Sequence, residues 1–248
     1  MKTWYKRPLP VLSALVVAAV VFAMVGEKVK AAGEGTITGT VKLNGTAPHM
    51  KGIDMSKDPY CAQQHKEPAK LENIVVGANG GIQNVVLYIS EGLSPAAASA
   101  VPSEEPTFDQ KGCMYTPHVM AVDVNQKFKV VTGDQTTHNI HPLPAAGTGN
   151  IGWNKSQPPG APPIEADWKA QEVAIPVKCN IHPWMHGWHV VVKGPYAITD
   201  ENGNFTIKNV PAGSYTVTAW QEEYGTQTAK VTVAGGQAAK ADFTFKAK

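Results

Sequence analysis

Charged residues are scarce in this chain of 248 residues: they make up 17% of it, and the formal net charge is +2. The sequence has no run rich in lysine and arginine and no interleaving of arginine with aromatic residues, so nucleic acid is not expected as a partner. It also lacks a glycine-rich phosphate loop, a strand-turn-helix serine nucleophile motif and a zinc-peptidase His-x-x-Glu pattern. We therefore predict that the protein is not an enzyme and has no catalytic residues.

Helical periodicity is also scarce, whereas glycine (23) and proline (19) are abundant. This composition favours an all-β fold. Hydrophobic residues make up 43% of the chain, which is enough to bury the core of one large or two small β domains. In the C-terminal part, short runs with apolar residues at alternate positions are separated by turn signals, a pattern that indicates a β-sandwich.

Long apolar runs are missing except near the start of the chain. There, basic residues precede an apolar run over residues 11–25, which is short for a membrane span but typical of a secretory signal. We predict a signal peptide over 1–31, cleaved after Ala31; an uncleaved N-terminal anchor is the alternative. Either way the rest of the chain is expected in the periplasm or another extracytoplasmic space, with membrane contact only if the segment is retained.

Cysteine is limited to three residues, Cys61, Cys113 and Cys179. In an exported chain, an odd number suggests one disulfide and one thiol with a special role. Because Cys179 lies among histidines, we predict a disulfide between Cys61 and Cys113. The alternative is a second metal site, in which Cys61, His65, Cys113 and His118 supply four nitrogen and sulfur ligands to zinc or copper.

Two motifs in the C-terminal part of the chain are typical of a small β-sandwich domain. A hairpin signal is followed by a second turn and an alternating strand, at Thr199, Asp200, Gly203 and Phe205 and then at Val210, Pro211, Ala212, Gly213 and Tyr215. This pattern resembles the carboxypeptidase regulatory-like (transthyretin-like) β-sandwich domains, which are not catalytic. The resemblance implies an opening strand of the form Gly-x-Ile/Val-x-Gly-x-Val, and the chain has one at residues 35–41.

This opening strand lies more than 150 residues before the hairpin. Insertions at exposed loop tips are tolerated when their ends lie close together, so we predict that a second domain is inserted into the sandwich. The expected domains are the first part of the sandwich at 33–103, the inserted domain at 104–193 and the second part of the sandwich at 194–248. Three consecutive units are the alternative.

The predicted insertion contains a dense group of possible metal ligands. Cys179, His182 and Met185 follow one another at intervals of three residues between two predicted strands, and His138 follows a turn. Two imidazoles and a thiolate, with a weak axial thioether, are the ligands of a blue-copper electron-transfer centre. A Cys-x-x-His-x-x-Met loop can bring three of them around one ion, and a strand elsewhere in the fold must supply the fourth.

The same residues resemble the cupredoxin family, in particular its amicyanin and plastocyanin type. The motifs of that family are matched at Cys179, His182, Pro183, Trp184, Met185, Gly187 and 190–192, and upstream at 137–141. The resemblance implies a Greek-key β-sandwich or barrel, one copper ion that alternates between Cu(I) and Cu(II), and the metal ligands His138, Cys179, His182 and Met185. It also implies that His182 faces solvent and is the exit for the electron.

Histidines beyond this set leave alternatives open. His186 directly follows Met185 and can compete with it as a ligand, or a second copper can bind near the rim with help from a neighbour such as His141. In the simpler interpretation, His141, His186 and His189 are solvated or orient the ligands. The long segment 142–172 has no clear period, and part of it is expected to cap the site or to dock a partner.

These observations predict an exported type 1 (blue) copper protein that carries single electrons between redox protein partners of the cytochrome, oxidase or dehydrogenase type. A periplasmic copper carrier or chaperone is one alternative, because of the additional histidines. A non-catalytic adhesive or partner-binding sandwich is the other.

Overall fold

The structure is a computed structural model that describes residues 1–2 and 33–248. The predicted signal peptide therefore lies almost entirely outside the described residues. Those residues form 17 β-strands and two short helices, which confirms the all-β fold class. Neither helix of the described part has the length and apolar character needed to cross a membrane.

Two sheets of four strands each form what we call the host sandwich. The first sheet consists of β13 (Asn204–Val210), β1 (Gly35–Asn44), β16 (Ala238–Lys240) and β17 (Phe243–Lys246). The second consists of β12 (Tyr196–Ile198), β2 (Val86–Glu91), β14 (Gly213–Gln221) and β15 (Gly225–Val233). Apolar residues alternate along β1, so that Ile37 and Val41 enter a core shared with Leu87, Ile207 and Val217.

The hairpin between β12 and β13 has the predicted turn chemistry. Asp200 accepts backbone N–H groups from Asn202 and Asn204, at 2.9 and 2.8 Å. Gly203 has a φ of +75°, and a Cβ at this position would lie 2.3 Å from the carbonyl oxygen of Val41. Only glycine therefore allows the turn to approach β1 this closely.

Two further sheets form what we call the inserted sandwich. One consists of β5 (Val119–Asp123), β11 (His186–Val192), β10 (Glu172–Lys178), β7 (His138–Pro142) and β8 (Lys155–Gln157). The other consists of β4 (Met114–Thr116), β3 (Thr107–Lys111), β6 (Phe128–Thr132) and β9 (Ile164–Ala166). Their buried core includes Phe108, Phe128, Ile140 and Ile175.

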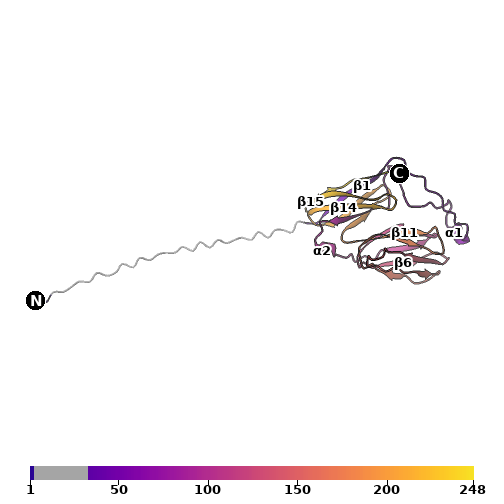
Figure 1. The fold of residues 1–248 in the computed structure, drawn as a ribbon, viewed down its shortest axis with the longest axis horizontal. Helices are drawn as coiled ribbons and strands as arrows, with labels where there is room; N and C mark the ends of the chain where they lie inside the picture. Colours follow the sequence, from indigo (N-terminus) through magenta and orange to yellow (C-terminus); the bar gives the residue numbers. More distant parts are fainter. Residues whose placement is uncertain (3–32) are drawn as a thin grey trace. The chain divides into compact units, whose positions relative to one another are not determined.

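The chain leaves the host sandwich after β2 and passes through α2 (Pro95–Ala98) into the inserted sandwich, and it returns at β12 (Figure 1). In chain order, the strands of the inserted sandwich thus lie between β2 and β12 of the host. The strands of the inserted sandwich run from Thr107 to Val192, and the proposed domain boundaries at 104 and 193 lie just outside them.

Two segments differ from expectation. The long segment 142–172 contains two short strands, β8 and β9. The segment around α1 (Pro59–Gln63) was assigned to the host sandwich, yet Ile53, Met55 and Cys61 pack into the core of the inserted sandwich.

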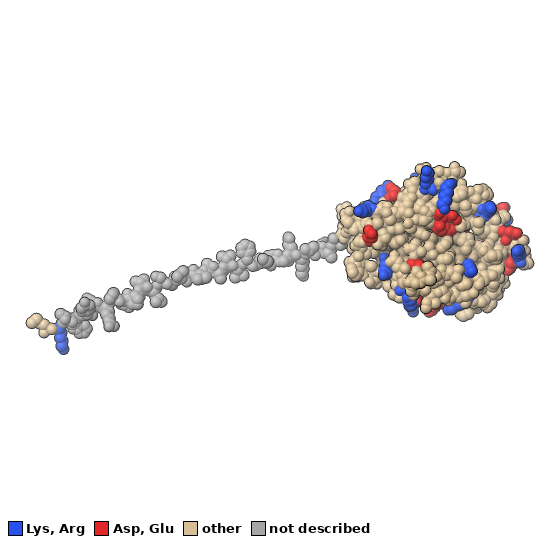
Figure 2. Space-filling model, in the orientation of Figure 1, with Lys and Arg blue, Asp and Glu red and all other residues tan. Residues whose placement is uncertain are grey.

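A third apolar cluster joins the two sandwiches. It contains side chains from β2 and β14 of the host and from β5 and β11 of the insertion, among them Tyr88, Trp220, Val119 and Val190. The rings of Trp188 and Trp220 pack edge to face across it, with centroids 5.7 Å apart. On the face shown in Figure 2, lysine and carboxylate side chains are mixed, with broad uncharged areas between them.

Candidate metal centre

The strand order of the inserted sandwich brings the predicted ligands together. His138 begins β7, Cys179 directly follows β10, and these two strands are paired. The loop from Cys179 to Met185 is closed by two backbone hydrogen bonds: Cys179 N–H donates to Met185 C=O at 3.1 Å, and Met185 N–H donates to His182 C=O at 2.9 Å. This compact loop turns the thiol and the imidazole of His182 toward β7.

Three ligand atoms converge at this point. Nδ1 of His138 lies 3.0 Å from Nδ1 of His182, which in turn lies 3.8 Å from Sγ of Cys179. Each atom lies within 4.8 Å of the others, and all three residues are buried. Because transition metals bind imidazole nitrogen and thiolate sulfur at about 2.0–2.3 Å, one shared ion is compatible with these separations. Met185 is also fully buried and belongs to the same core as Cys179.

Each imidazole is oriented by a carboxylate on its far side. Nε2 of His138 lies 2.8 Å from Oδ2 of Asp134, and Nε2 of His182 lies 3.0 Å from Oδ2 of Asp58. A carboxylate accepts the Nε2–H hydrogen bond, so the Nδ1 lone pair of each ring is left for the centre of the cluster. Metal-binding histidines are characteristically held in this way.

The environment of Cys179 favours its thiolate form. The backbone N–H groups of Asn139 and His182 donate to Sγ at 3.5 and 3.4 Å. Burial raises the pKa of the thiol, but hydrogen bonds from His138 and from these backbone groups outweigh it and lower the pKa to about 6. The pKa of His138 is raised, because hydrogen bonds to Asp134 and Cys179 outweigh the effect of burial.

The two orienting carboxylates are themselves held by the two segments that the disulfide joins. Asp58 caps α1 by accepting N–H groups from Tyr60 and Cys61 at 2.9 and 3.1 Å. Asp134 accepts the N–H groups of Gly112 and Cys113 at 2.8 and 2.7 Å. Sequence reasoning missed both carboxylates.

The predicted disulfide between Cys61 and Cys113 is confirmed. It removes both thiolates from the alternative zinc or copper site, and the histidines proposed for that site lie apart. Nε2 of His65 lies 2.7 Å from the carbonyl oxygen of Gly112, whereas His118 contacts Glu222 at 2.8 Å.

The expectation that His182 faces solvent is wrong, because its exposed fraction is only 2%. The segment around α1 covers the ring: Asp58 bonds to Nε2, and Sγ of Cys61 lies 3.7 Å from the same nitrogen. The neighbouring Ile181, in contrast, is 50% exposed.

The other histidines lie outside this cluster. His141 contacts Asn180 at the surface, with 3.1 Å between its Nδ1 and Oδ1 of the amide. His189 is fully buried among Phe108, Phe128 and Trp168, and burial lowers its pKa to about 3, so it stays neutral. The ring of His186 packs on His118 and not on the cysteine cluster.

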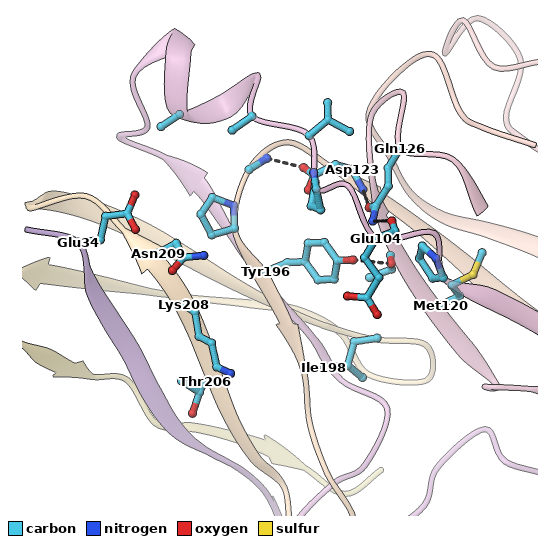
Figure 3. A pocket seen from close by; sticks show the side chains of 18 of the residues that line it. Glu34, Glu104, Met120, Asp123, Gln126, Tyr196, Ile198, Thr206, Lys208 and Asn209 are labelled. Atoms are coloured by element: carbon cyan, nitrogen blue, oxygen red, sulfur yellow. Dashed lines mark hydrogen bonds between the residues drawn. The ribbon is translucent and has the colours of Figure 1, made fainter. Parts of the chain in front are cut away.

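A cavity of about 710 Å³ lies elsewhere in the described residues. Figure 3 shows Asp123, Tyr196 and Lys208 among the residues that line it. None of the predicted metal ligands does so. The candidate metal centre is therefore a closed cluster and not an open substrate pocket.

Residues 186–246 match the family model of the carboxypeptidase regulatory-like domain. The C-terminal part of the host sandwich is thus similar to carboxypeptidase regulatory-like domains. The match begins at β11, which pairs with β5 and β10 of the inserted sandwich, and then covers β12 to β17. Comparison with curated protein sequences finds no match.

Comparison with solved structures finds copper proteins of low identity. A Cu-containing nitrite reductase from Thermus scotoductus SA-01 is 16% identical, with a TM-score of 0.33, and the match covers 42% of this chain and 26% of that one. Amicyanin from Paracoccus versutus is 14% identical (TM-score 0.31, 42% and 96% covered), and a purple cupredoxin from Nitrosopumilus maritimus is 16% identical (0.29, 35% and 99%). This chain spans about a quarter of the nitrite reductase. TM-scores of this size do not establish a common fold by themselves, so the site is judged by its own geometry.

Proposed function

We propose that the protein is an exported type 1 copper protein that carries single electrons between redox partners. The observation that carries this proposal is the convergence of Nδ1 of His138, Nδ1 of His182 and Sγ of Cys179, with the outer nitrogen of each imidazole bonded to a carboxylate. Two imidazoles and one thiolate are the in-plane ligand set of blue-copper sites. When bound there, copper supplies reversible one-electron chemistry between Cu(I) and Cu(II).

The residues of the chain would act mainly by holding a fixed geometry. His138, Cys179 and His182 would hold the ion, and Met185 would be the fourth ligand that the cupredoxin resemblance implies. Asp134 and Asp58 fix the imidazole rings and their tautomers, and the two N–H groups at Cys179 stabilise its negative charge. Such a preorganised, buried site needs little rearrangement when its charge changes by one.

Burial favours electron transfer over the competing functions. His138 and Met185 have no exposed surface, and Cys179 is only 3% exposed. A copper chaperone needs ligands that its partner can reach, and a catalytic copper needs an open position for its substrate. The closed ligand shell supports a carrier that is not an enzyme.

The partner is proposed to be a redox protein that docks over the ligand loop. Ile181 is exposed next to His182, and the ring of Trp184 packs against the imidazole of His182 with centroids 5.1 Å apart. Electrons would then pass to the partner through the residues that cover His182, because the edge of its ring is not exposed. The Cys61–Cys113 disulfide supports an oxidising, extracytoplasmic location.

The test is a spectroelectrochemical titration of the full copper-loaded chain. We expect one thiolate-bound copper per chain, one-electron behaviour with superimposable oxidative and reductive curves, and no loss of that copper through repeated cycles. Release of copper on reduction would instead favour the copper carrier. Steady consumption of nitrite or another small substrate by the loaded protein would show that it is an enzyme.

A further inference from the structure

A second group of possible ligands lies where the two sandwiches meet. His118 directly precedes β5, His186 begins β11, and Glu222 directly follows β14 of the host. Their ligand atoms lie within 4.8 Å of one another. Glu72 lies at the edge of the group, with one carboxylate oxygen 3.9 Å from Nδ1 of His118.

Backbone contacts hold this group together. The N–H of Trp188 donates to the carbonyl of His118 at 2.9 Å, and a Cβ on Gly187 would lie only 2.8 Å from that same oxygen. Glycine at 187 therefore allows β11 to approach His118 closely. The His118 and His186 rings pack edge to face with centroids 5.2 Å apart.

Three polar atoms of this group are buried without a hydrogen-bond partner among the described residues: Nδ1 of His118, Nε2 of His186 and Oε1 of Glu222. The side chains of His118 and Glu222 are only 1% and 3% exposed. Buried polar atoms are almost always satisfied in folded proteins, so the free Nε2 of His186 and Oε1 of Glu222 indicate an absent ligand, whereas Nδ1 of His118 faces Glu72. The His118–Glu222 contact alone does not account for them.

The tautomers leave lone pairs for an ion. Nδ1 of His186 lies 3.2 Å from the carbonyl of Trp184, which can only accept, so Nδ1 carries the hydrogen and Nε2 has the free lone pair. Nε2–H of His118 donates to Oε2 of Glu222 at 2.8 Å. An ion that replaces this hydrogen would move it to Nδ1, which faces Glu72. The result is the carboxylate–histidine–metal arrangement that orients many metal-binding imidazoles.

We propose that His118, His186 and Glu222 form a second metal site, separate from the cysteine cluster, and that Glu72 orients His118. Two imidazole nitrogens and one carboxylate oxygen suit a divalent ion of the zinc or copper(II) type. Because the ligands come from both sandwiches, the bound ion would fasten the insertion to its host. The site shares no ligand with the cysteine cluster. Its occupancy therefore does not depend on the electron transfer proposed for that cluster.

The test uses the full chain, first loaded with Cu(I) under reducing conditions, which favours the thiolate site over a site of nitrogen and oxygen ligands, and freed of excess metal. It is then titrated with Zn²⁺ in a calorimeter. We expect one equivalent of Zn²⁺ to bind and to raise the melting temperature. Glu222→Gln, which keeps the size of the side chain, and His186→Ala are each expected to weaken this binding at least ~10-fold. His49→Ala, which removes an exposed histidine, is the matched control and is expected to bind as the wild type does.

A parallel titration with Co²⁺ identifies the ligands. Cobalt at the proposed site is expected to give d–d bands without sulfur-to-cobalt charge transfer, whereas cobalt at Cys179 would show that charge transfer. Circular dichroism of each variant verifies folding, and if Glu222→Gln does not fold, His186→Ala decides. The proposal is overturned if no Zn²⁺ binds beyond the cysteine cluster, or if folded variants keep wild-type affinity. If copper gives no thiolate charge-transfer band, the proposed function fails but the second metal site does not, because the cobalt spectrum reports on each site separately.

Discussion

The inserted sandwich carries two histidine clusters that differ in how their polar atoms are satisfied. In the cysteine cluster, both imidazoles of His138 and His182 have their outer nitrogens bonded to carboxylates. In the cluster of His118 and His186, three buried atoms have no partner in the part of the chain that the structure describes. The first cluster is preorganised by the fold itself, whereas the second is complete only if something binds there.

The origin of the ligands explains this difference. The cysteine cluster is built entirely on the inserted sandwich and on the segment around α1 that packs into its core. The second cluster combines residues of the insertion with Glu222 of the host, so its geometry depends on how the two sandwiches are joined. The first site thus belongs to one domain and the second to the interface between the two.

The largest change in stability is expected when the disulfide that supports the first cluster is removed. The double substitution Cys61→Ser and Cys113→Ser opens a link across 52 residues, which is expected to lower the free energy of unfolding by about 4 kcal/mol. It also releases α1, and with it Asp58, so copper binding should weaken. Chemical denaturation and a copper titration measure the two effects. A loss below ~1 kcal/mol with unchanged copper affinity would mean that the covalent link does not organise the cluster.

The interface between the sandwiches is expected to respond to pH through Asp123, which accepts the N–H of Gly194 at 2.6 Å near the large cavity (Figure 3). Burial raises the pKa of Asp123 from 3.8 to about 6. Its contribution to stability is thus fully present below pH ~4 and is lost as the pH rises through ~6, a change of up to about 3 kcal/mol. Unfolding curves at several pH values, compared with those of Asp123→Asn, measure the difference. If both proteins change in parallel between pH 4 and 6, Asp123 is not the group responsible.

Orientation of the imidazoles in the first cluster is tested by Asp134→Asn. The amide keeps a single oxygen for the four donors that Asp134 now serves, so His138 is expected to lose its fixed tautomer. We expect copper affinity to fall about 10- to 100-fold, while Zn²⁺ binding at the second cluster stays unchanged. Competition with a chelator of known affinity measures this. Asp167→Asn, at a carboxylate that pairs only with Lys169, is the matched control; equal affinities of the two variants would contradict the assigned role.

The smallest effect is expected for His141→Ala. This histidine lies at the surface, contacts Asn180 and belongs to neither cluster. Its removal is expected to change stability by less than ~0.5 kcal/mol and to leave both metal affinities as they are. A calorimetric titration of each metal is sufficient. A clear loss at either site would add His141 to that site and blur the distinction between the two clusters.

The sequence predicted the parts of this arrangement that depend on local pattern. The loop from Cys179 to Met185 has regular spacing between two strands, and the hairpin at Asp200 has a strong turn signal, so both were found. Asp58 could not be found, because it meets His182 across 124 positions and its own surroundings indicate only a helix cap. Asp134 lies four residues before His138, but an aspartate after a glycine was interpreted simply as a turn.

The second cluster was beyond sequence reasoning for the same physical reason. His118 and Glu222 are 104 positions apart and come from different domains, so no periodicity or spacing connects them. His186 was noticed only for its proximity to Met185. The exposure predicted for His182 was wrong because the segment around α1, which was assigned to the host, folds over the insertion and covers it.

The most direct test of the central claim is the visible absorption spectrum of the copper-loaded chain beside that of Cys179→Ser. If Cys179, His138 and His182 hold one copper ion, the oxidised wild type is expected to show an intense thiolate-to-copper charge-transfer band, coloured blue or green, that saturates at one copper per chain. The serine variant is expected to lack that band while remaining folded by circular dichroism. A colourless oxidised wild type with copper bound, or an unchanged band in Cys179→Ser, would contradict the assignment of this cluster as a blue-copper centre.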